Sequence, residues 1–70
     1  MKFDEAVLLC QETYGPTVGD LIRAHDAMGD TEEDKFAQKL IQITMLVVLW
    51  RETNKPSDLK QRIQEMWNSL

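Results

Sequence analysis

The chain has 70 residues, of which 43% are apolar and 29% are charged, and its net charge is −4 at neutral pH. This length and composition are typical of one small globular domain and exclude both a disordered chain and a chain of several domains. We therefore expect residues 1–70 to form a single domain. The acidic balance disfavours nonspecific binding to nucleic acid or to an anionic membrane.

Three further features concern the compartment. A lone cysteine, Cys10, excludes an internal disulfide and is insufficient for a zinc site, and a free thiol fits a reducing environment. The segment MKFDEAVLLC has two acids before a short apolar run, unlike a secretory signal peptide. No run approaches the ~20 apolar residues of a membrane span. These features predict a cytoplasmic protein without membrane contact.

Glycine and proline divide the chain into four periodic blocks. The breaks are Gly15-Pro16, Gly29-Asp30 and the segment NKPS that begins at Asn54. The first block predicts a helix over about 4–14, with Asp4 as N-cap and Gly15 as the stop. Its apolar stripe has helical spacing: Phe3, Val7, Cys10 and Tyr14.

The second and fourth blocks also predict helices. Thr17 is a plausible N-cap for a helix over about 17–28, and Ser57 for one over about 58–69. Each has one apolar face. In chain order these faces hold Val18, Leu21, Ile22, His25 and Met28, then Leu59, Ile63, Met66, Trp67 and Leu70.

The third block predicts a long helix over about 32–53. Thr31 followed by three acids is typical of a helix start. Its core stripe is Phe36, Leu40, Ile43, Val47 and Trp50. The segment ITMLVVLW, residues 43–50, is nearly all apolar, so the helix loses the polar side that Gln38 and Gln42 give its first half. Such a short run is also compatible with a β-strand, but the sequence offers no partner strand.

A helix that is apolar all round is expected to be buried all round. Three short helices leave at least one side of a small bundle wet, so we expect a second copy of the chain to cover the remaining side. The predicted architecture is an all-α bundle of about four helices with a long central third helix, associating as a homodimer. The predicted dimer interface is Ile41, Met45, Val48 and Leu49.

No catalytic or metal-binding motif is evident. Cys10 and His25 lie on core-facing stripes and could meet in space, but a nucleophilic pair also needs an orienting group and a cleft. Packing roles are favoured for both. DAMGDTEED, residues 26–34, has five acids but lacks the ligand order of an EF-hand loop. We expect no enzymatic activity, no metal and no cofactor.

Charge divides the chain in two. From Asp4 to Asp34 there are nine acids and one base, whereas from Lys35 to Leu70 there are three acids and six bases. Two interpretations are open: the halves attract each other within one fold or across a dimer, or the acidic half docks on a basic partner. We expect a small noncatalytic interaction or regulatory module with one larger protein partner. The predicted partner surface is Asp20, Asp26, Asp30, Glu32 and Glu33.

Two alternatives remain open. Residues 8–24 have the outline of a helix-turn-helix, which would make the protein a DNA-binding regulator. The second helix, however, offers Asp20, Arg23 and Asp26 where a DNA reader needs basic or amide side chains. The same acids would suit a DNA mimic that inhibits a DNA-binding protein.

Overall fold

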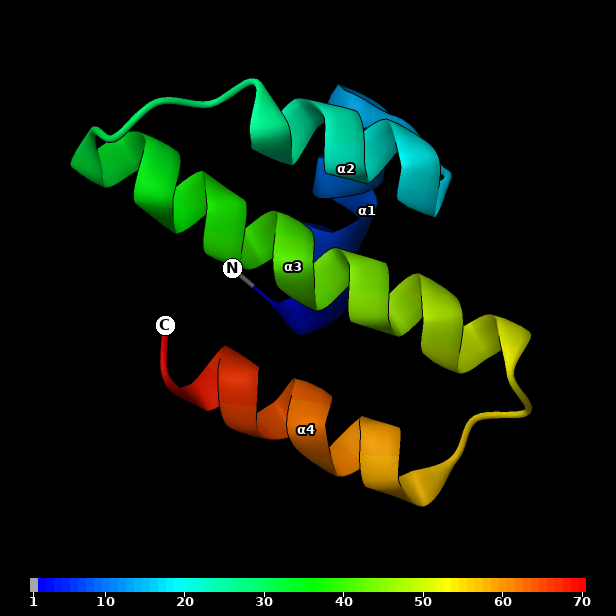
Figure 1. Cartoon of the computed structure of the whole chain (residues 1–70). Coiled ribbons are helices and arrows are strands. Elements are labelled where there is room, and N and C mark those ends of the chain that lie inside the picture. The colour runs from blue at the N-terminus through cyan, green and yellow to red at the C-terminus, as the bar shows by residue number, and fades with distance from the viewer. Residues whose placement is uncertain (1) are drawn as a thin grey trace.

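The computed structural model describes residues 2–70, and these form four helices and no strand (Figure 1). The helices are α1 (Phe3–Tyr14), α2 (Val18–Asp26), α3 (Glu32–Glu52) and α4 (Ser57–Asn68). The expected all-α architecture is confirmed. The apolar run of residues 43–50 lies inside α3, so its reading as a strand is wrong.

The long helix α3 is the centre of the bundle, and each of the other three helices packs against it. Figure 1 shows α2 antiparallel to α3 along one edge, α4 along the opposite edge, and α1 crossing behind α3. Helix α1 also contacts α2. Three neighbours from the same chain therefore surround much of α3.

Polar side chains fix two of the helix starts. The Thr17 hydroxyl accepts from the Asp20 amide at 3.1 Å, and the Asp20 carboxylate accepts from the Thr17 amide at 3.3 Å, which completes a capping box. The Thr31 hydroxyl accepts from the Asp34 amide at 3.1 Å. Both threonine caps that the sequence predicts are confirmed.

The other two predicted caps are wrong. Helix α1 begins at Phe3, so Asp4 lies within its first turn and Lys2 is the N-cap residue. Helix α4 begins at Ser57, after Pro56, whose extended backbone serves as the N-cap without a side-chain hydrogen bond. At the end of α1, Gly15 has φ +123°, a conformation that side chains disfavour, so the predicted stop is confirmed.

The core consists of two adjoining clusters along α3. One cluster joins α3 to α1 and α4, and the other joins α3 to α1 and α2. The buried residues of the first are Val7, Ile43, Val47 and Ile63. The buried residues of the second are Cys10, Leu21, Ile41 and Val48. The chain itself therefore covers two flanks of the ITMLVVLW segment, whereas Leu49 stays exposed.

Candidate functional site

The predicted dimer interface is divided by the fold. Ile41 is 0% exposed and Val48 is 8% exposed, because both pack against Cys10 and Leu21. Their assignment to a surface contact needs correction, since α1 and α2 already cover them. Periodicity shows that a flank of α3 is apolar, but it does not show whether a helix of the same chain or a second copy covers that flank.

The other two predicted interface residues lie at the outer seam between α2 and α3. Leu49 is 39% exposed, and Met45 is half-buried against the second cluster. Ile22 of α2, predicted to be in the core, is 46% exposed. It precedes His25 by one turn, and His25 contacts Gln42 of α3, so Ile22 lies on the α2 flank that faces α3. The seam therefore carries Ile22, Met45 and Leu49.

The acids predicted to bind a partner do not form one free cluster. Asp20 serves the capping box and pairs with Arg23. Hydrogen bonds from Thr17, followed by the charge of Arg23, lower the pKa of Asp20. Asp26 lies 3.2 Å from the Nδ1 atom of His25. The fold thus uses two of the five acids locally.

The remaining predicted acids lie at and beyond the turn into α3. Asp30, Glu32 and Glu33 are exposed, and a Glu32 carboxylate oxygen lies 3.8 Å from Lys35 Nζ. Acids at a helix start interact favourably with the helix dipole. A structural role therefore accounts for their position, and no further contact gathers them into a site.

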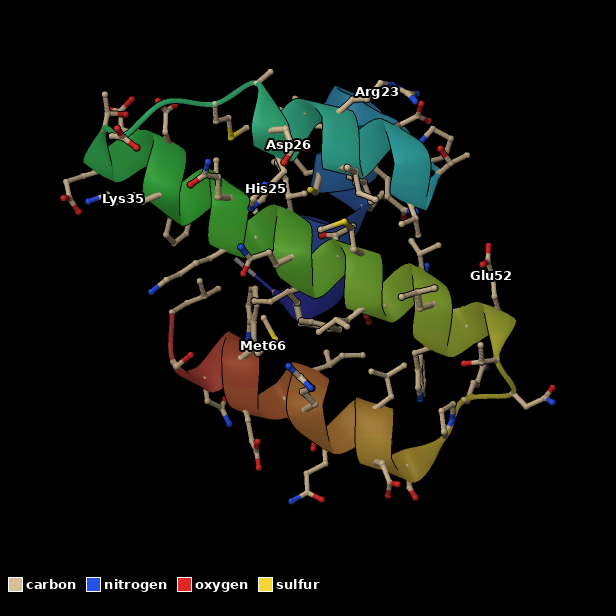
Figure 2. All side chains as sticks on the ribbon, in the orientation of Figure 1. Arg23, His25, Asp26, Lys35, Glu52 and Met66 are labelled. Atoms are coloured by element: carbon tan, nitrogen blue, oxygen red, sulfur yellow. The ribbon has the colours of Figure 1, made fainter. Side chains whose placement is uncertain are left out.

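Cys10 and His25 are separate groups. Cys10 is buried, and this burial raises the pKa of its thiol. His25 faces α3, where its Nε2 atom lies 3.0 Å from the amide nitrogen of Gln42 and its carbonyl accepts from Gln38 (Figure 2). A buried, protonated thiol lacks the reactivity of a thiolate. Each group tightens the packing between helices.

The outer face of α1 carries an exposed apolar pair that the sequence reasoning did not assign to a site. Leu8 is 57% exposed and Leu9 is 48% exposed, because both point away from the buried Val7 and Cys10. Acids lie one turn before and after this pair: Asp4, Glu5 and Glu12. The available signal was their position opposite the Phe3, Val7, Cys10 and Tyr14 stripe. We call Leu8, Leu9 and these three acids the α1 face.

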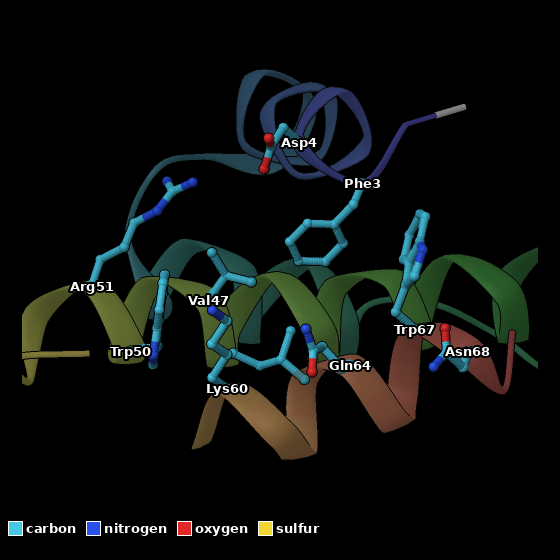
Figure 3. Close-up of a pocket in the computed structure, with 10 residues that line it drawn as sticks. Phe3, Asp4, Val47, Trp50, Arg51, Lys60, Gln64, Trp67 and Asn68 are labelled. Carbon is cyan, nitrogen blue, oxygen red and sulfur yellow. The ribbon is translucent and has the colours of Figure 1, made fainter. Parts of the chain in front are cut away.

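A hollow of about 580 Å³ opens between α1, α3 and α4 (Figure 3). Its walls are aromatic and aliphatic: Phe3, Val47, Trp50, Ile63 and Trp67. The rings of Phe3 and Trp67 meet edge to face, with centroids 5.1 Å apart. Figure 3 shows this pair at one end of the hollow and Trp50 at the other. The sequence predicts that these side chains lie in the core, but it does not predict the hollow between them.

The turn between α3 and α4 holds the Trp50 end of the hollow. Asn54 and Lys55 both have positive φ, and the Lys55 amide donates to the Trp50 carbonyl at 2.9 Å. The Lys55 ammonium lies 5.6 Å from the centre of a Trp50 ring. The indole nitrogen of Trp50 is buried without an acceptor, which is energetically costly for a donor.

Charged groups surround the opening of the hollow. Arg51 of α3 and Lys60 of α4 line it and are exposed, and Asp4 lines it from α1. Neither Arg51 nor Lys60 forms an ion pair with another residue in the range 2–70. Gln64 and Asn68 of α4 add amide groups. The result is an apolar hollow with two cations and one acid at its edge.

Comparisons with known proteins give no family: no family model, curated protein or solved structure matches the chain. Within residues 2–70, no cluster of three or more potential metal ligands is present. Over the same range, no helix combines the length and hydrophobicity needed to cross a bilayer.

Proposed function

We propose that the protein is a small noncatalytic interaction module that docks on a larger protein through the α1 face. The exposure of Leu8 and Leu9, at 57% and 48%, is the observation that supports this most. Adjacent leucines on one helix can enter an apolar groove of a partner as anchors. The docking surface is thus α1, in place of the acids of α2 and the α2–α3 turn.

Charge supports the same partner chemistry. Asp4, Glu5 and Glu12 flank the leucines, so the α1 face fits an apolar groove bordered by lysine or arginine. Complementary charge at the edge of an interface mainly raises the association rate and the specificity. The acids also disfavour DNA as the ligand, because phosphates would be repelled.

Affinity capture from the source cells tests this proposal. Wild-type protein should enrich one basic protein, and the double variant Leu8→Glu, Leu9→Glu should lose it. Leu70→Glu is the matched control, because Leu70 is 41% exposed and lies at the other end of the chain. The captured protein is then purified, and its direct binding is measured by calorimetry. Equal capture by the wild type and the double variant would contradict the proposal.

The homodimer stays a prediction with a revised interface. We place it at the outer seam of α2 and α3, where Ile22, Met45 and Leu49 lie. The seam and the α1 face share no residue, so we propose a dimer that leaves the α1 face free. Sedimentation equilibrium should give about twice the 8.1 kDa chain mass, and Leu49→Glu should halve it. A wild-type monomer at micromolar concentration would refute the dimer.

A further inference from the structure

The hollow between α1, α3 and α4 has the size and walls of a ligand site. Its volume, about 580 Å³, lies within the range of small-molecule pockets. Aromatic side chains from three helices border it: Phe3, Trp50 and Trp67. The space exists because α1 and α4 both pack on α3 at positions that leave a gap between them. An apolar group placed there would bury further aromatic surface.

The charged side chains at the edge of the hollow determine which ligand charge fits there. Arg51 and Lys60 have no ion-pair partner within residues 2–70, whereas Asp4 is the acid among the lining side chains. The lining side chains therefore carry one net positive charge. Arginine binds carboxylates through paired hydrogen bonds, and such charge-assisted bonds are stronger than neutral ones. An anionic head group fits this edge.

Aromatic rings can also attract cations, so a cationic ligand is the alternative to an anionic one. The Lys55 ammonium already lies over Trp50 at 5.6 Å from the ring centre. Trp67 contacts the ring of Phe3. A cationic ligand would also be repelled by Arg51 and Lys60. The arrangement therefore favours an anion over a cation.

From this geometry we infer that the hollow binds a small amphipathic carboxylate, with its apolar body among Phe3, Trp50 and Trp67 and its carboxylate at Arg51 and Lys60. Gln64 of α4 also lines the hollow and can donate from its amide nitrogen. This site shares Asp4 with the α1 face but includes neither Leu8 nor Leu9, so it does not rest on the proposed docking function.

A head-group series tests the inference on the full chain. Octanoate, octanol and octylammonium share one apolar body and differ in the charge of the head. Calorimetry at neutral pH should show octanoate binding at least about tenfold more tightly than octanol, and octylammonium binding most weakly. The indole N–H signals of Trp50 and Trp67 should shift on binding in NMR spectra. Absence of saturable octanoate binding, or equal affinity for all three probes, would overturn the inference.

Charge variants locate the head group. Arg51→Gln with Lys60→Gln should abolish the preference for octanoate over octanol, so that the ratio of the two dissociation constants falls to about one. Lys35→Gln with Lys39→Gln is the matched control, because it makes the same change in net charge at the other end of α3 and should preserve the preference. Asp4→Asn should strengthen octanoate binding severalfold, since it removes the acid at the edge. Preserved preference in the Arg51 and Lys60 variant would contradict the assigned carboxylate position.

Discussion

The sequence predicts Ile41 in a dimer interface, whereas the structure buries it in the core. Truncation of Ile41 distinguishes these two assignments. Ile41 is 0% exposed and packs with Leu21 of α2 in the second core cluster. Ile41→Ala removes buried carbon atoms and leaves a cavity, which typically costs about 2–5 kcal/mol of unfolding free energy. A domain of this size has a total stability of about 3.5–10 kcal/mol at typical values per residue. The substitution therefore removes a large share of the stability.

If Ile41→Ala does not fold, two milder substitutions still allow the unfolding free energies to be compared. Ile41→Val should cost about 0.5–1.5 kcal/mol. At a concentration where the protein is monomeric, Leu49→Ala should cost about 1 kcal/mol or less, because Leu49 is 39% exposed in the single chain and water fills the space that the side chain leaves. Ile41→Ala should therefore be the most costly of the three variants.

Urea unfolding, followed by the fluorescence of Trp50 and Trp67, measures these differences. Midpoint shifts convert to free energy through the slope of the transition. In thermal melts, each 1 kcal/mol corresponds to ~4–8 °C for a domain of this size. If Ile41→Ala costs no more than Leu49→Ala, then Ile41 is not enclosed by α1 and α2, and the core assignment is wrong.

The remaining predictions concern helix ends, turns and the thiol. Thr17→Ala should cost about 1 kcal/mol in urea unfolding, whereas Ser57→Ala should change stability by a few tenths, because its hydroxyl caps nothing; equal costs would refute this. Gly15→Ala should destabilise, since at φ +123° the added Cβ would collide with the Asp20 side chain, whereas Gly19→Ala, with no contact closer than 3.6 Å, should raise the unfolding free energy by up to about 1 kcal/mol. Burial raises the pKa of Cys10, so the protonated thiol contributes its full stability at neutral pH, and this stability is lost as the pH rises above the ordinary thiol pKa and through the raised pKa of the folded state. Alkylation by iodoacetamide should accordingly be slow in the native protein and fast in urea; rapid native labelling at neutral pH would contradict the burial of the thiol.

Helix positions could be predicted because the signals that set them are local. Gly15 and the Asn54-to-Ser57 segment interrupt the pattern, and the four helices lie within two residues of the expected bounds. The prediction of Ser57 as an N-cap is wrong for a local reason as well. The Pro56 backbone, with φ −63° and ψ 139°, already supplies the extended conformation of an N-cap, so the helix begins one residue earlier than predicted.

Burial was less predictable, because it depends on which helix covers which flank. Phe36 and Leu70 belong to apolar stripes, yet they are 56% and 41% exposed. Helix α3 has 21 residues and α4 has 12, so α4 spans only part of the length of α3 at 1.5 Å per residue. The stripe of α3 continues beyond the covering helix. Lengths of partner helices, in addition to periodicity, decide which stripe residues are buried.

The separation of charge along the sequence has a spatial consequence that sequence reasoning did not reach. The acidic half of the chain contains α1, and the basic half contains most of α3 and all of α4. The start of α1 lies against α3 and α4, so Asp4 shares an opening with Arg51 and Lys60. Because two cations there stand against one acid, net positive charge remains beside the aromatic hollow. The charge pattern therefore bears on the proposed binding site.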